Sequence, residues 1–171
     1  MKKLARAFIW LRRLPYCRGF GIQSPTDYRF VREVVEETWP YYAYKELAGD
    51  DDWLTQKLGR LYLRLANYRQ PETIIDRVDM ACYLHAGCRK ARVVDDAPTV
   101  QLAVVPMSDD DALLDRCNEQ SIVVFQDIWR HKKRWQRIVH DPRAWITFDL
   151  YYCGIVVFDR KRTANHYVVN F

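Results

Sequence analysis

The residue best placed to do chemistry in this sequence is Asp127, which follows an apolar run and one glutamine. Residues 122–125 carry only apolar side chains, which is typical of a strand buried on both faces. In α/β proteins, ligands bind outside the carboxyl ends of such strands. Asp76 and Asp95 also follow short apolar segments that are predicted to be strands. A carboxylate at a strand end can bind a hydroxyl group or a metal ion, or accept a proton.

Other side chains with catalytic potential lack the partners that their chemistry needs. His131 lies four residues after Asp127 and could act as a base, but one histidine in a basic helix is more typical of a surface residue. The acidic triplet at 109–111 suits a helix amino terminus after Ser108, because adjacent residues do not face one point. The sequence contains no G-x-S-x-G, P-loop or H-E-x-x-H motif. We therefore expect no metal site.

Composition predicts a single folded domain with a substantial core. The chain has 171 residues, of which 49% are hydrophobic and 14% aromatic, so a disordered chain is excluded. A net charge of +5 favours anionic partners without specifying one. The five cysteines form no C-x-x-C pair, which favours reduced thiols and a cytoplasmic location. No apolar run approaches the roughly 20 residues of a transmembrane helix, so no membrane span is expected.

The elements around Asp127 predict a mostly parallel sheet. A strand at 121–125, a helix at about 130–140 and a strand at 144–150 form the strand–helix–strand unit of parallel sheets. The last three strands have short connections, so we expect antiparallel hairpins at the carboxy-terminal edge. The other predicted elements are strands at 73–76, 92–95, 100–105, 155–158 and 166–171, and helices at 78–88 and 108–117.

The first 70 residues are predicted to form a helical extension packed on an α/β core at 71–171. Residues 2–14 place apolar side chains at helical spacing, with Lys and Arg on the other side. Such a helix could lie on a membrane surface, or pack its apolar side on its own domain; we favour the second interpretation. Ser24 and Pro25 begin a helix that is expected to reach Trp39. An aromatic connector at 41–44 and a leucine-striped helix at 53–68 follow.

Several stretches together resemble one enzyme family. Residues 19–25 (GFGIQSP) resemble an entry motif G-H-G-I-H-S-P, and residues 41–44 resemble Y-Y-A-Y. Residues 123–128 are similar to V-V-F-D-D-I, and the strands after Asp149 resemble the family's closing strands. The family is the class I S-adenosylmethionine-dependent methyltransferases, and more narrowly an O-methyltransferase-like group of Bacteroidetes-type bacteria. The resemblance implies a Rossmann-like fold.

The same resemblance assigns roles to the three strand-end carboxylates. Asp76 matches the family's acidic position after the first strand, and Asp95 or Asp96 would bind the ribose hydroxyls. Asp127 stands where some relatives have a carboxylate that binds a metal ion or acts as a base. These residues would form the cofactor site if the protein bound S-adenosylmethionine.

Two departures from the family pattern affect the cofactor site. Methyltransferases of this type hold the cofactor on a glycine-rich turn, but no glycine follows Asp76 before Gly87. Only residues 96–99 separate the second predicted strand from the third. A parallel crossover takes a dozen or more residues, and four residues span about 14 Å at most. A strand and its helices are therefore expected to be missing, with 92–95 either antiparallel to its neighbour or outside the sheet.

The sequence thus predicts a truncated, degenerate methyltransferase-like protein that binds no S-adenosylmethionine and acts as a binding or scaffold module. Its partners are not specified, and it could form a homo-oligomer. One alternative is an active methyltransferase with a trimmed cofactor site. The other is a basic module that binds nucleic acid or an anionic surface. The simpler interpretation of the same residues is a solvated helix face with its tryptophans in the core. The residues of that basic module would be Trp129, Lys132, Lys133, Arg134, Trp135 and Arg137.

Overall fold

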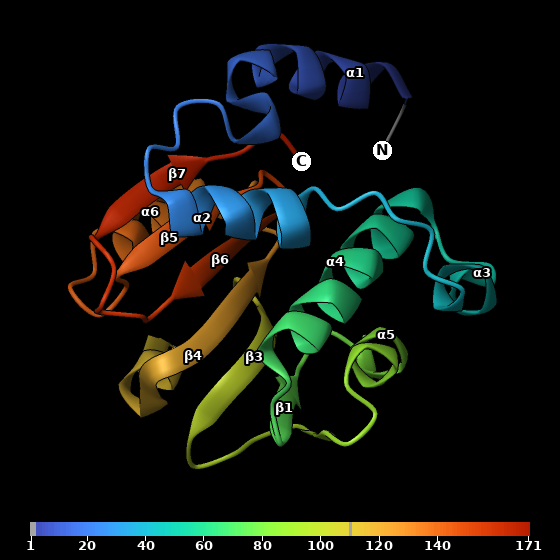
Figure 1. The fold of residues 1–171 in the computed structure, drawn as a ribbon, viewed down its shortest axis with the longest axis vertical. Helices are drawn as coiled ribbons and strands as arrows, with labels where there is room; N and C mark the ends of the chain where they lie inside the picture. The colour runs from blue at the N-terminus through green and yellow to red at the C-terminus, as the bar shows by residue number, and fades with distance from the viewer. Residues whose placement is uncertain (1–2, 110) are drawn as a thin grey trace.

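A computed structural model of the chain describes residues 3–109 and 111–171. Lys2, in the expected helix 2–14, and Asp110, in the acidic triplet, lie outside the described residues. Within the described part, one sheet of seven strands is covered by helices on both faces (Figure 1). None of the described helices combines the length and the apolar character needed to cross a bilayer.

The sheet has the strand order β2-β1-β3-β4-β6-β5-β7. Four of its pairings are parallel, and the two antiparallel pairings both involve β6. This confirms an α/β class with a mostly parallel sheet and an antiparallel strand in the carboxy-terminal part. The strands are β1 (Thr73–Asp76), β2 (Arg92–Val94), β3 (Val100–Pro106), β4 (Cys117–Gln126), β5 (Ile146–Asp149), β6 (Cys153–Val157) and β7 (Asn165–Val168).

The expectation that the last three strands form antiparallel hairpins is only half right. β5 and β6 do so, but β7 pairs in parallel with β5, from Ile146 opposite Asn165 to Asp149 opposite Val168. The reason is that β6 already has β4 on one edge and β5 on the other. The chain reverses after β6 as expected. It then crosses past β5, and β7 pairs with the edge of β5 that β6 leaves free.

The expectation for residues 92–95 is wrong, because β2 pairs in parallel with β1, with Val94 opposite Ile75. β2 has only three residues, so the chain has to return over only a short distance to start β3. Residues 95–99 make this return without a helix. Val94 and Ala97 pack against the buried cluster that contains Ile75, so the connection covers that face of β1.

The helices begin where the sequence provides caps. Ser24 Oγ accepts a hydrogen bond from the backbone N–H of Asp27, and Asp52 Oδ1 accepts two from the first turn of α4. The helical elements are α1 (Lys3–Arg12), η1 (Leu14–Gly19), α2 (Pro25–Phe30), the π-helical η2 (Val31–Val35), α3 (Ala43–Ala48), α4 (Trp53–Arg69), α5 (Ala81–Gly87), η3 (Asp111–Arg116) and α6 (Lys132–Val139).

Several elements differ from those expected, among them the helix expected at 78–88, which begins only at Ala81. The helix that begins after Ser24 ends at Val35 through a π-helical segment rather than at Trp39. The aromatic connector at 41–44 leads into α3, which the sequence did not indicate. The helix expected at 108–117 is a 3₁₀ segment, because the chain enters β4 already at Cys117.

Alternate residues of the strands enter two separate cores. Ile74, Leu102 and Val124 pack against η2, α4 and α5, whereas Ile75 and Val123 pack on the opposite face, which α6 covers. The first of these clusters contains residues of both the helical extension and the strands, so the two parts share one core.

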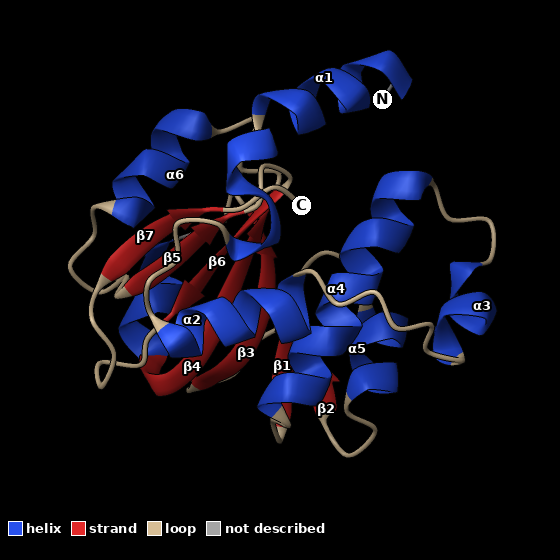
Figure 2. Ribbon diagram, turned by 45° about the horizontal axis from the view of Figure 1, so that its top comes forward, coloured by secondary structure: helices blue, strands red, loops and turns tan. Residues whose placement is uncertain are grey.

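The first helix contradicts the sequence interpretation. α1 has no buried residue, and its apolar stripe does not pack on the domain. Leu4 is 85% exposed and Phe8 is 62% exposed. Figure 2 shows α1 apart from the layers formed by the sheet and its covering helices.

Candidate functional site

The strand order reverses between β1 and β3, which lie side by side and continue to opposite edges of the sheet. In open α/β sheets, ligands bind in the crevice outside the carboxyl ends of the strands at this point. The loops after β1, β2 and β3 are therefore the first place to look for a site. Asp76 and Asp95, two of the three predicted site residues, lie in or next to these loops.

The carboxylate of Asp76 is occupied by its own loop. Its side chain is buried, Oδ1 accepts a hydrogen bond from Val78 N at 3.0 Å, and Oδ2 accepts one from Met80 N at 2.8 Å. The loop makes its left-handed turn at Asp79 (φ 58°) and enters α5 at Ala81. Asp76 thus shapes a tight turn without glycine.

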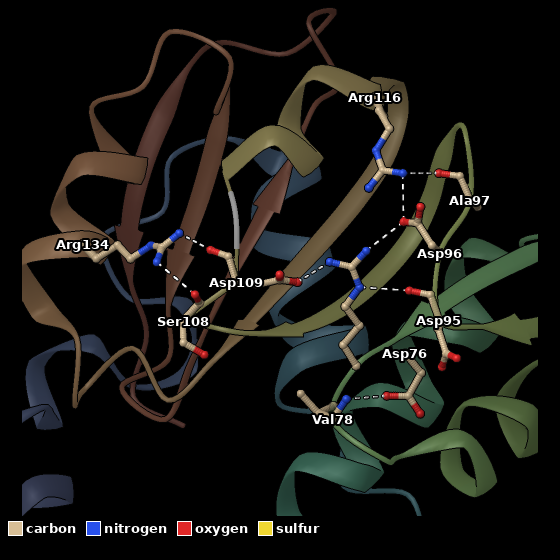
Figure 3. A network of polar contacts seen from close by, with 10 residues as sticks. Asp76, Val78, Asp95, Asp96, Ala97, Ser108, Asp109, Arg116 and Arg134 are labelled. Carbon is tan, nitrogen blue, oxygen red and sulfur yellow. Dashed lines mark hydrogen bonds and ion pairs between the residues drawn. The ribbon is translucent and has the colours of Figure 1, made fainter.

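Arg77 joins the loops that follow three different strands. Figure 3 labels its partners Asp95, Asp96 and Asp109. Its Nε donates to the Asp95 carbonyl at 2.9 Å, its Nη2 to Asp96 Oδ1 at 2.8 Å and its Nη1 to Asp109 Oδ2 at 2.6 Å. The hydrogen bond with Asp109 is the main reason that the pKa of Arg77 is raised. The Asp95 side chain is exposed, so this residue contributes to the network through its backbone.

Two more arginines extend this network of charges. Arg116 Nη1 donates to Asp96 Oδ1 at 2.9 Å and to the Ala97 carbonyl at 2.6 Å. The hydrogen bond from Arg116 is the main cause that lowers the pKa of Asp96. Arg134 of α6 donates to the carbonyls of Ser108 and Asp109. The loop after β3 is therefore held from both sides. We call Arg77, Asp96, Asp109 and Arg116 the edge network.

Asp127 lies at the end of β4, two strands away from β1. It adopts a left-handed backbone (φ 65°), and its N–H donates to the Tyr152 carbonyl at 2.8 Å. Its Oδ1 accepts a hydrogen bond from Trp129 Nε1 at 3.2 Å, and Arg130 Nε lies 3.9 Å away. The structure therefore places the three predicted residues at the carboxyl ends of the strands, but it does not bring them into one site. The carboxylates of Asp76 and Asp127 bind different partners, and Asp95 takes part through its carbonyl.

Metal-ligating side chains are dispersed in the described part of the chain. Among the side chains that the structure describes, no three from His, Cys, Asp or Glu are placed to hold one metal ion. His131 is exposed at the start of α6, where its carbonyl accepts hydrogen bonds from the backbone of the first turn.

The tryptophans near the basic helix belong to the fold. Trp135 is 2% exposed, packs on Phe125, and donates from Nε1 to Asp149 Oδ2 at 3.1 Å. Trp129 stacks on Tyr151 with ring centroids 6.2 Å apart. The buried Trp135 indole cannot stack on a nucleic-acid base, whereas Trp129 is half-buried beside the exposed cations of α6.

The largest hollow that we describe was missed by the sequence reasoning. A groove of about 1030 Å³ lies between η2, the segment 36–45, α4 and the carboxy-terminal residues. A signal was present in the sequence, because Lys57, Arg60 and Arg64 follow at helical spacing on the side of the helix next to the leucine stripe. The charged residues of this groove are Arg18, Arg32, Glu36, Glu37, Lys45, Lys57, Arg60 and Arg64; its aromatic residues are Trp10, Trp39, Tyr41, Tyr42, Tyr44, Trp53 and Phe171.

Cations in the groove lie on aromatic rings. Lys57 Nζ is 4.2 Å from the centroid of the Phe171 ring, and Arg60 Cζ is 5.1 Å from that of Tyr44. Burial lowers the pKa of Lys57. Arg64 is buried beneath the groove and donates to the carbonyls of Val34 and Val35. The groove thus combines positive charge with flat apolar surfaces on a fixed floor.

No protein-family model, curated protein or solved structure matches this chain. The functional interpretation therefore depends on the sequence motifs, the strand order and the contacts described above.

Proposed function

We propose that this protein is a methyltransferase-like chain with a reduced Rossmann-like fold that binds no S-adenosylmethionine and acts as a binding module. The observation that carries this proposal is the ion pair between Arg77 and Asp109, 2.6 Å apart. It joins the loop after β1 to the loop after β3, across the place where the strand order reverses. A nucleoside in a fold of this class would have to lie there.

The energetic argument concerns what a cofactor would have to displace. Arg77 makes three hydrogen bonds to the loops after β2 and β3. Hydrogen bonds to charged groups contribute about 1.5–3 kcal/mol each where solvent is excluded, and less where it is not. The Arg77 side chain is 28% exposed, so its contacts are only partly screened. A bound nucleoside would lose much of its own binding energy in opening them.

The turn after β1 supports the same proposal. In the methyltransferase pattern, glycines let the backbone approach the cofactor closely. Here Asp79 occupies the left-handed position, and both oxygens of Asp76 bind backbone N–H groups. These oxygens are therefore committed to the turn rather than to a ligand.

The groove beside α4 is the surface that we propose for binding. It contains six cations and two acids, with seven aromatic residues around them. Cations next to aromatic rings suit a ligand that carries both negative charge and a flat apolar part. The binding activity would then lie in the helical extension rather than at the carboxyl ends of the strands.

Calorimetry with S-adenosylmethionine and S-adenosylhomocysteine tests the first half of the proposal. We expect no saturable heat from the wild-type chain with either compound. Binding of one molecule per chain, or methyl transfer to any acceptor, would contradict the proposal and favour an active enzyme with a trimmed site.

Fluorescence of anilinonaphthalene sulfonate, a flat anionic probe, tests the second half. We expect saturable binding that Arg60→Gln weakens about tenfold, because this arginine lies on the wall of the groove. Arg137→Gln, which removes the same charge from α6, is the matched control and should leave binding unchanged. Equal effects of both substitutions would show that the probe binds to positive surface charge in general, and would contradict binding in the groove.

A further inference from the structure

The apolar stripe of α1 is exposed, and its Phe8 also borders a hollow of about 400 Å³ that Trp129 and Lys132 line on the domain side. Leu4, Phe8 and Leu11 are 85%, 62% and 58% exposed, and the helix contains no buried residue. These positions are four and three residues apart, so they form one face of the helix. Figure 1 shows the helix lying beyond the layers of the domain.

The helix contacts its own domain through the opposite face. Arg6 lies over the Trp53 ring, with Cζ 4.4 Å from the ring centroid. Arg13, which directly follows the helix, donates to Asp149 Oδ1 at 2.8 Å and to the Val169 carbonyl at 3.0 Å. Ile9, between these two on the same face, is half-buried. The helix is therefore docked by its arginines with its apolar side outward, the reverse of an ordinary surface helix.

The charge around this stripe is of one sign. The sequence contains no aspartate or glutamate before Asp27, whereas residues 2–18 contain six lysines and arginines. Lys3 and Arg12 are exposed, and helical geometry places them on the two borders of the stripe. An apolar stripe bordered by cations matches an anionic lipid surface, which offers acyl chains beside phosphate groups.

We propose that α1 binds the surface of an anionic phospholipid membrane. Leu4, Phe8 and Leu11 enter the boundary between headgroups and acyl chains, while Lys3 and Arg12 contact the phosphates. The contacts of Arg6 and Arg13 keep the helix docked on the domain, so the stripe is presented without unfolding. This inference does not depend on the absence of cofactor binding. A second copy of the chain is a poorer occupant, because two such helices would bring cations together without an acid on either.

Co-sedimentation of the full chain with lipid vesicles tests the proposal. We expect binding to phosphatidylcholine vesicles that contain one third phosphatidylserine, and binding at least tenfold weaker to vesicles of phosphatidylcholine alone. Binding should weaken with added salt, because exposed charges are screened. Equal binding to both kinds of vesicle, or binding to neither, would overturn the proposal.

Substitutions identify the surface involved. Phe8→Gln should weaken binding about tenfold or more, because the variant lacks the apolar ring whose transfer from water to the membrane favours binding. Tyr42→Gln changes a side chain that is 95% exposed but lies outside α1, so it should have no effect. Arg12→Gln should weaken binding to the anionic vesicles about fivefold, whereas Arg137→Gln on α6 should not. All four positions are exposed, so these variants should fold.

Analytical ultracentrifugation of the same variants decides between a membrane and another copy of the chain. We expect the wild-type chain and Phe8→Gln to have the same oligomeric state in the absence of lipid. A dimer that Phe8→Gln dissociates, together with no vesicle binding, would show that a second copy covers the stripe and would refute the membrane role.

Discussion

The edge network and the groove beside α4 both contain several arginines, but the two regions use them differently. In the edge network, Arg77 and Arg116 pair with Asp96 and Asp109. In the groove, cations outnumber acids and lie on aromatic rings. The loops at the carboxyl ends of the strands have their charges neutralised internally, whereas the helical extension has more cations than acids in its groove.

Under the proposed loss of cofactor binding, this contrast indicates which part of the molecule keeps a binding function. Paired charges hold loops in place and have little attraction left for a ligand. Unmatched charges beside apolar surfaces attract ligands and surfaces of opposite sign.

Arg64→Ala should cause the largest loss of stability. Arg64 is 6% exposed and donates to the carbonyls of Val34 and Val35. The substitution would remove both of these hydrogen bonds. We expect the free energy of unfolding to fall by about 3–4 kcal/mol. Urea denaturation followed by circular dichroism measures it. Arg60→Ala, one turn away on the groove wall, should cost less than about 1 kcal/mol; equal losses would show that Arg64 is not the floor of the groove.

Arg77→Gln should cause a smaller loss, about 1–2 kcal/mol, because the edge network is partly exposed. The double-mutant cycle with Asp109→Asn should give a coupling energy of about 1 kcal/mol. Hydrogen exchange should accelerate in the loops after β1, β2 and β3 and stay unchanged in α4. Arg89→Gln, at an exposed position near α5, is the matched control. Additive substitutions would mean that Arg77 and Asp109 do not hold the loops together.

The smallest effect concerns pH and the Asp96 carboxylate. The hydrogen bond from Arg116 lowers the pKa of Asp96 below its ordinary value of 3.8. A lowered folded-state pKa means that the stabilisation is complete above the unfolded pKa, and is lost as the pH falls through the folded value. An NMR titration of the Asp96 carboxyl should show the low pKa, and Arg116→Gln should raise it towards 3.8. Asp141, which Arg143 binds, should titrate alike in both proteins; an unchanged Asp96 in the variant would remove Arg116 from the edge network.

Sequence reasoning predicted the elements whose side chains alternate within a buried sheet. The strands that contain Ile74, Val104 and Val123 could be predicted from the sequence alone, because their apolar runs are short and lie between polar segments. The helix α4 was predicted from its leucine stripe. These signals are local in the sequence.

The remaining features depend on contacts between distant segments. The partner of β7 follows from which strand edges are already taken, and the pairing of β2 from its shortness. The orientation of α1 depends on Trp53 and Asp149, far along the chain. The three carboxylates were correctly placed at strand ends, but the arginines that bind their loops could not be assigned to them from the sequence.

The most direct test of the account is a titration of the isotope-labelled chain with S-adenosylmethionine, followed by the amide NMR signals of Val78, Met80 and Asp109. These amides belong to the loops that Asp76 and Arg77 hold across the point where the strand order reverses. The account predicts that their signals do not move up to millimolar concentrations of the compound. Saturable shifts confined to these loops would show that the crevice opens to the cofactor, and would contradict the account.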